Sequence, residues 1–121
     1  MQDWLSKSAC DLGRAIGAGE VDPVNLAHAF FDRIDGHALK DKIYARLTKD
    51  RAMAEARAAS QRAKSGQRLS VLDGVPISWK DLFDTAGEGT EAGSKLLAGR
   101  VPEADAVVLQ NATCLLYTSP S

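Results

Sequence analysis

A lysine stands at the end of a short apolar run, and this run constrains the fold more than any other part of the chain. In residues 75–80, Val75 and Ile77 alternate with other side chains, and Lys80 closes the run on the face that also holds the small Ser78. Alternation with a period of two is typical of a β-strand with one buried face, so we predict a strand here. Because an ammonium group is costly to bury, a lysine in such a strand is expected to be paired or functional.

Capping residues predict helices in much of the remaining sequence. Asp22-Pro23 is a clear helix start, because aspartate caps free amides and proline suits the first helical position. Ser6 or Ser8 can cap an earlier helix, Thr48 can cap a later one, and Ser65-Gly66 ends the latter. The predicted helices span residues 8–18, 23–36, 48–64 and 94–98, with another from residue 105 onward.

A second strand and a close helix contact are also predicted. Residues Ile43–Leu47 are short, apolar and partly β-branched or aromatic, which indicates a strand. The long helix after this strand has alanines along one narrow face, which would let another element approach closely. These alanines are Ala52, Ala56, Ala59 and Ala63.

Composition and charge exclude several classes of protein. The 121 residues suffice for one domain, and a net charge of −1 argues against nucleic acid binding, which usually requires a basic face. We find no apolar stretch near the ~20 residues that span a bilayer and no signal peptide. Cys10 and Cys114 lie far apart without metal or redox spacing, so we expect a reduced, cytoplasmic setting.

Motifs in a fixed order give this chain a family resemblance. They are GVPISWKD at 74–81, TEAGS at 90–94, GRVP at 99–102 and DAVV at 105–108. Together they resemble the N-terminal part of the amidase signature family, from about Ser8 to about Ala112. The resemblance implies an α/β fold, a mixed β-sheet flanked by helices, of which this chain would supply a truncated N-terminal part. It also implies amide hydrolysis, or release of ammonia from glutamine, by a Ser–cis-Ser–Lys triad.

By position, the resemblance makes Lys80 the catalytic lysine. To accept a proton it must be neutral, so its pKa must lie well below the free value of ~10.4, and burial would shift it in that direction. The alternative is a structural lysine paired with Asp81 or Asp84. The flanking motifs favour the catalytic role.

The other triad members have no counterpart in the sequence. In the family they lie in and after a Gly-Gly-Ser-Ser-Gly-Gly-like stretch, and the chain contains none. Neither Ser78 nor Ser94 has the surroundings of a nucleophile. His28 and His37 lack both triad partners and ligand spacing, so we predict no metal and no cofactor. The resemblance assigns no substrate-binding residue within this chain.

Four other features have modest predicted roles. Trp79 is expected to pack rather than to line a pocket. Glu91 stands where many relatives have Thr or Ser, which could affect substrate preference. Residues 100–102 are expected to position the following helix, and the charged residues of 49–68 to form a solvated helix face.

The sequence leaves the function open between three hypotheses. We predict that residues 1–112 form the N-terminal segment of a single amidase domain and that residues 113–121 are a non-native tail, since the character of the sequence changes at Cys114. The favoured hypothesis is that the chain is a fragment of an amidohydrolase and is inactive alone. Its full-length parent would act on a small-molecule amide, and it would bind neither nucleic acid directly nor a membrane. The second is a fragment of the glutamine-hydrolysing component of a tRNA-dependent amidotransferase, which would need further subunits. The third is a non-catalytic module that binds a partner.

Overall fold

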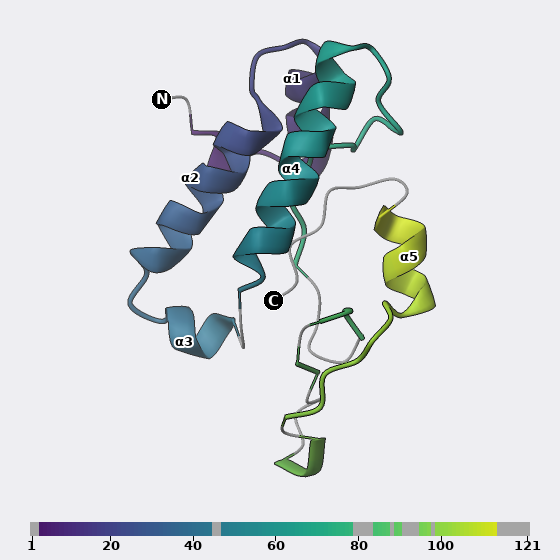
Figure 1. Ribbon diagram of the computed structural model, residues 1–121. Coiled ribbons are helices and arrows are strands. Elements are labelled where there is room, and N and C mark those ends of the chain that lie inside the picture. Colours follow the sequence, from purple (N-terminus) through teal and green to yellow (C-terminus); the bar gives the residue numbers. More distant parts are fainter. Residues whose placement is uncertain are drawn as a thin grey trace.

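The computed structural model describes residues 3–44, 47–78, 84–87, 89–90, 95–97 and 99–113. Helices α1, α2 and α4 form one body, while α5 lies to one side of it (Figure 1). The elements are η1 (Trp4–Ser6), α1 (Ala9–Gly17), α2 (Pro23–Asp35), α3 (Lys40–Ile43), α4 (Lys49–Lys64), η2 (Lys95–Leu97) and α5 (Val107–Thr113).

The two ends of α1 follow the sequence prediction. Ser8 is the capping serine, and its side chain accepts a hydrogen bond from the amide of Asp11 at 3.1 Å. Beyond the helix, Gly19 adopts a φ of 76°, a left-handed conformation that glycine allows without steric cost. The next amide, that of Glu20, then bonds to the carbonyl of Ala15 at 2.9 Å and closes the last turn.

Helix α2 also begins and ends where the sequence indicates. Asp22 accepts a hydrogen bond from the amide of Val24 at 2.7 Å, and Pro23 occupies the first turn. Gly36 is the C-terminal cap. The Asp22 carboxylate also accepts a hydrogen bond from Ser60 Oγ at 2.9 Å, which ties the start of α2 to α4.

The alanine face of α4 packs closely against α2, as predicted. Ala52 and Ala56 have no exposed surface and contact Ala27 and Phe31 of α2 in one core cluster, which also includes Met53. Thr48 precedes the helix as expected, but its side chain makes no capping hydrogen bond. The predicted end at Ser65-Gly66 is confirmed.

A second core cluster attaches the segment that precedes Lys80 to the helices. Val75 is buried against Leu12 and Ile16 of α1 and Leu26 of α2. Of the two side chains on the face predicted to be buried, Val75 is buried and Ile77 is half-buried. Gly13 of α1 faces the turn before Val75 so closely that a Cβ atom there would lie 2.1 Å from the carbonyl oxygen of Val71.

The predicted strands are not found among the described residues. Ile43 ends α3, while Tyr44, Leu47 and residues 75–78 belong to neither helix nor strand. A strand exists only when its backbone groups bond to a neighbouring strand, and the amide of Val75 bonds locally to the carbonyl of Leu72. The described part is thus helical, and it does not contain the sheet of the expected α/β fold.

The last two predicted helices are present in shorter form. Within the predicted helix over 94–98, the structure has the single turn η2, and residues 94 and 98 lie outside the described part. The helix predicted from residue 105 begins at Val107 and ends at Thr113. Residues 114–121 of the predicted tail lie outside the described part as well.

Candidate functional site

Lys80 itself lies outside the described residues, so the candidate site is known from the chain on both sides of it. Upstream, the structure describes the turn at 69–74 and residues 75–78. Downstream, it describes residues 84–87 and the chain from 99 to 113. Each side contains an aspartate bound to an arginine of α4.

On the upstream side, Asp73 forms a two-pronged ion pair with Arg62. The guanidinium donates from Nε to Oδ2 at 2.7 Å and from Nη2 to Oδ1 at 2.8 Å, and the aspartate side chain is only 1% exposed. The amide of Leu69 also donates to Oδ2, at 3.1 Å. Burial would raise the pKa of Asp73, but the hydrogen bonds from Arg62 and Leu69 outweigh it and lower that pKa. Asp73 is therefore an ionised anchor for the turn at 69–74.

On the downstream side, Asp105 forms the equivalent pair with Arg51. Two hydrogen bonds of 2.8 and 2.9 Å join the guanidinium to the carboxylate, and Arg51 also bonds Glu55 of the same helix at 3.0 Å. The carboxylate accepts a further bond from the amide of Ala86, at 2.8 Å. The hydrogen bond from Arg51 is the main cause that lowers the pKa of Asp105. Asp105 thus connects the loop after Lys80 to α4.

The loop from Asp84 to Ala106 is closed at its base. The amide of Ala106 donates to the carbonyl of Asp84 at 2.8 Å, and Arg100 donates to both carboxylate oxygens of Asp84 at 2.6 and 2.9 Å. Farther along, the amide of Gly87 bonds to the carbonyl of Pro102 at 3.0 Å. The predicted role of residues 100–102 in positioning the following helix is consistent with this closure, which joins both ends of the loop directly before α5.

The charged face of α4 corrects one prediction. Sequence reasoning expected the charged residues of 49–68 to be solvated, yet Arg51 and Arg62 are mostly buried in long-range ion pairs. The spacing of Arg51 and Arg62 could have indicated a shared role, because residues eleven positions apart lie on nearly the same face of a helix. The partners Asp73 and Asp105 were missed, since nothing local in the sequence pairs them with α4.

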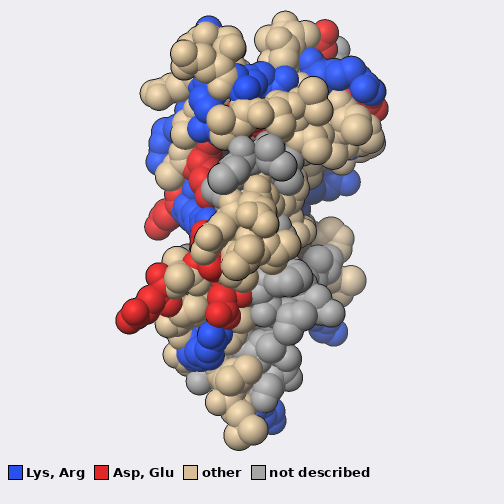
Figure 2. Space-filling view, turned by 90° about the vertical axis from the view of Figure 1, so that its right-hand side faces the viewer, with Lys and Arg blue, Asp and Glu red and all other residues tan. Residues whose placement is uncertain are grey.

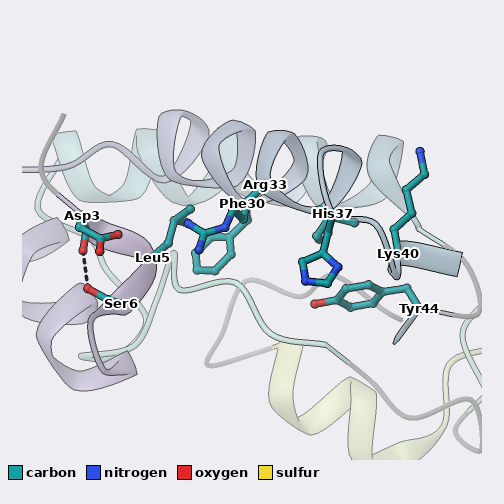
Figure 3. A pocket seen from close by; sticks show the side chains of 9 residues that line it. Asp3, Leu5, Ser6, Phe30, Arg33, His37, Lys40 and Tyr44 are labelled. Carbon is teal, nitrogen blue, oxygen red and sulfur yellow. Dashed lines mark hydrogen bonds between the residues drawn. The ribbon is translucent and has the colours of Figure 1, made fainter. Parts of the chain in front are cut away.

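Two hollows share part of their lining, and the smaller of them lies beside the described part of the Lys80 segment. The smaller, of about 90 Å³, is lined by Pro76, Ile77 and Ser78 together with Phe30, Ile34, Tyr44 and Leu47. The larger, of about 290 Å³, shares Phe30, Ile34 and Tyr44 with it and opens between η1, α2 and α3. Figure 3 shows the Phe30 ring pointing from α2 toward the larger hollow, with the rings of His37 and Tyr44 lying next to each other at one end.

Three of the other residues singled out from the sequence lie in the described part of the chain. His28 is exposed on α2, whereas His37 lines the larger hollow and accepts a hydrogen bond at Nδ1 from the amide of Leu39. Ser78 is exposed. Trp79, Asp81, Glu91 and Ser94 lie outside the described residues.

Neither a metal site nor a membrane helix is found in the described part of the chain. There, no group of three or more His, Cys, Asp or Glu side chains is placed to hold a metal ion, and no helix is long and apolar enough to span a bilayer. Cys10 is exposed with a free thiol, and Cys114 lies outside the described part. On the face shown in Figure 2, acidic and basic side chains lie among one another, as expected where ion pairs join the segments.

Sequence comparisons find a family and relatives. Residues 25–113 match the family model described as Amidase. The chain is 38% identical over 110 residues to the A subunit of the glutamyl-tRNA(Gln) amidotransferase from Streptomyces coelicolor, covering 89% of this chain and 22% of that protein. It is 43% identical over 96 residues to the protein of the same name from Chloroflexus aggregans, covering 79% and 20%. The chain therefore spans about a fifth of the length of these curated relatives.

Structural comparisons find an amidase and a second, longer chain with the same arrangement of elements. The fold superposes on the native peptide amidase of Stenotrophomonas maltophilia with a TM-score of 0.86 and 26% identity, covering 98% of this chain and 25% of that one. It also matches a structure described as a vestigial complex that reveals the origins of an s-triazine catabolic enzyme, with a TM-score of 0.87 and 26% identity, covering 95% and 26%. The arrangement of helices described above therefore recurs within much longer chains.

Proposed function

Because the chain belongs to the amidase family, we propose that it is the N-terminal segment of an enzyme that hydrolyses carbon–nitrogen bonds of a small-molecule amide, and that Lys80 is its catalytic lysine. The observation that most supports this role is the attachment of the chain on both sides of Lys80. Asp73 and Asp105, each bound to an arginine of α4, fix residues 73 and 86. A base that must accept a proton from a positioned hydroxyl requires such a fixed backbone.

The chemistry assigned to Lys80 is that of a general base. In the Ser–cis-Ser–Lys arrangement expected from the family, a neutral lysine accepts the proton of the nucleophilic serine through a bridging serine. The serine oxygen then attacks the amide carbon, and the proton later passes to the leaving nitrogen. Water hydrolyses the resulting acyl-enzyme and regenerates the serine.

The 121 residues provide only one of these three side chains. The sequence contains no Gly-Gly-Ser-Ser-Gly-Gly-like stretch, which would also supply the backbone amides that stabilise the oxyanion. We therefore expect that the chain alone releases ammonia from an amide no faster than the amide releases it in buffer without protein. Measurable hydrolysis that disappears in Lys80→Ala would contradict this expectation.

A chimeric enzyme tests the role of Lys80 directly. Residues 8–112 would replace the matching segment of the Streptomyces coelicolor protein, to which the chain is 38% identical. We expect this chimera to hydrolyse glutamine, and Lys80→Ala to lower kcat by about a thousandfold or more, because the serine loses its base. Lys64→Ala, a change at a lysine 74% exposed on α4, is the matched control and should retain activity. An active Lys80→Ala chimera would refute the assignment.

The second candidate is the glutamine-hydrolysing component of an amidotransferase, which would use glutamine as its ammonia source and work with further subunits. The observation that favours it is the identity of 38–43% to proteins of that name, against 26% to the peptide amidase. Addition of the other amidotransferase subunits to the chimera separates the two candidates. The unaltered Streptomyces coelicolor protein is the reference for this test. A glutaminase rate that rises as much as in this reference supports the amidotransferase, and loss of that rise in the chimera supports the independent amidase.

A further inference from the structure

We propose that Arg51 and Arg62 are positioning residues, and that α4 sets the position of Lys80 by fixing the chain at residue 73 before it and at residue 86 after it. This inference rests on the proposed role of Lys80 and goes beyond it. It assigns a function in positioning the lysine to a helix that contains no residue of the expected triad.

The two arginines are arranged along a rigid element. They are eleven residues apart in α4, which places their Cα atoms about 16 Å apart along the axis and within about 20° of the same face. Contacts on the adjoining face of α4 hold the helix in place, because Ala52, Ala56 and Ala59 are fully buried. The two guanidinium groups therefore project from a helix whose backbone cannot shift easily.

The pair near the C-terminal end of α4 fixes the upstream side. Arg62 binds both carboxylate oxygens of Asp73, and this carboxylate also accepts a hydrogen bond from the amide of Leu69. Arg68 adds bonds from Nη2 to the carbonyls of Val71 and Asp73, at 3.1 and 3.0 Å. The turn thus has its position set by side chains rather than by a neighbouring strand.

The pair near the N-terminal end of α4 fixes the downstream side. Arg51 binds both carboxylate oxygens of Asp105, and one of these oxygens also accepts a hydrogen bond from the amide of Ala86. Forked bonds between guanidinium and carboxylate define an orientation as well as a distance. Since both pairs start from one helix, they fix the separation between residues 73 and 86, and hence the span available to the segment that contains Lys80.

Each pair has its own amide as a reporter, so the two can be tested separately in the 121-residue chain. Exchange of individual amide hydrogens would be followed by NMR in the unaltered chain, in Arg51→Gln and in Arg62→Gln. We expect Arg51→Gln to accelerate exchange of the Ala86 amide about tenfold or more and to leave Leu69 within about twofold, and Arg62→Gln to do the reverse. Arg57→Gln makes the same chemical change at an exposed position of α4 and should alter neither amide.

A second measurement must report on Lys80 itself. It should not change if the two arginine–aspartate pairs only stabilise the fold. Trace acetylation across a pH series, analysed by mass spectrometry, gives the reactivity of Lys80 relative to the exposed Lys7 in each variant. In both Arg51→Gln and Arg62→Gln we expect the acetylation rate of Lys80 relative to Lys7, followed across the pH series, to change by a factor of about three or more. In Arg57→Gln this relative rate should stay the same.

The outcomes separate this proposal from the proposed function. A released amide with an unchanged Lys80 profile would overturn the positioning role, while loss of activity in the Lys80→Ala chimera would still support Lys80 as the base. Absence of protection at Leu69 and Ala86 in the unaltered chain would also overturn it, because the pairs would not hold the segment. Shifts of both amides and of the Lys80 profile support the proposal.

Discussion

Replacing Gly13 with alanine should destabilise the chain, although the same change in most helices is stabilising. Gly13 lies inside α1, where alanine is favoured over glycine by about 1 kcal/mol in the absence of other contacts. Here a Cβ atom would lie 2.1 Å from the carbonyl oxygen of Val71 and 3.2 Å from its carbon. Since ordinary contacts begin near 3.4 Å, the turn or the helix would have to move by roughly 1.3 Å.

Such a movement is resisted by the contacts of the turn. Val71 accepts a hydrogen bond from Arg68, and Asp73, two residues further, is held by Arg62. Overpacking costs typically 1–3 kcal/mol, and a clash with backbone belongs near the upper end, at about 3 kcal/mol. Subtracting the helix preference of about 1 kcal/mol leaves a net loss of about 2 kcal/mol in the free energy of unfolding.

Urea unfolding followed by circular dichroism measures this loss. With a slope of about 2 kcal/mol per molar urea, the midpoint should fall by about 1 M. Gly36→Ala is the matched control, because its φ is −82° and its nearest neighbour is 3.5 Å away, so the change should stabilise by about 0.4–1 kcal/mol. A Gly13→Ala chain with an unchanged or higher midpoint would refute the close contact between α1 and the turn.

Three further predictions concern the core, a cap and pH. Leu26→Ala, at a side chain only 1% exposed, should cost about 2–5 kcal/mol in unfolding free energy, and a loss below about 1 kcal/mol would mean that α1, α2 and Val75 do not share a core. Asp22→Ala should cost about 1–2 kcal/mol, because it removes the cap of α2 and the bond to Ser60; Asp35→Ala, an exposed change in the same helix, should cost less than about 0.5 kcal/mol. The pKa values of Asp73 and Asp105 are lowered in the folded chain, so their contribution is complete well above the unfolded value of about 3.9 and is lost as the pH falls through that value toward the lowered ones. The urea midpoint should therefore drop between about pH 5 and pH 3 and drop less in Asp105→Asn, and equal slopes in the two chains would contradict the ion pair.

The helices could be predicted from the sequence because the signals that define them are local. Asp22 and Ser8 bind amides two or three residues away, and the glycines that follow α1 and α4 act within one turn. The alanine face of α4 is local as well, although it predicts only a close neighbour and not that this neighbour is α2. Family membership was equally accessible, since it depends on the order of short motifs.

Neither the failure of the predicted strands to form among the described residues nor the ion pairs could be foreseen from the sequence, because both depend on partners that are distant in the sequence. Val75 and Ile77 alternate as strand residues do, but residues 75–78 have no neighbouring strand among the described residues and so form no ladder. Arg51 and Asp105 are 54 positions apart, and only the fold brings them within hydrogen-bond distance. Lys80 stays a prediction from its motif.

The close packing of α2 and α4 has a consequence for how such a protein can change over evolutionary time. Ala56 contributes only a methyl group to the core cluster that also holds the large ring of Phe31, so the summed volumes of the side chains in this cluster determine the spacing between the helices. A bulkier residue at 56 would push α4 outward together with both of its guanidinium groups. Substitutions within this cluster should consequently be tolerated when they compensate each other in volume, one side chain shrinking as another grows, even though none of its residues is near Lys80 in the sequence.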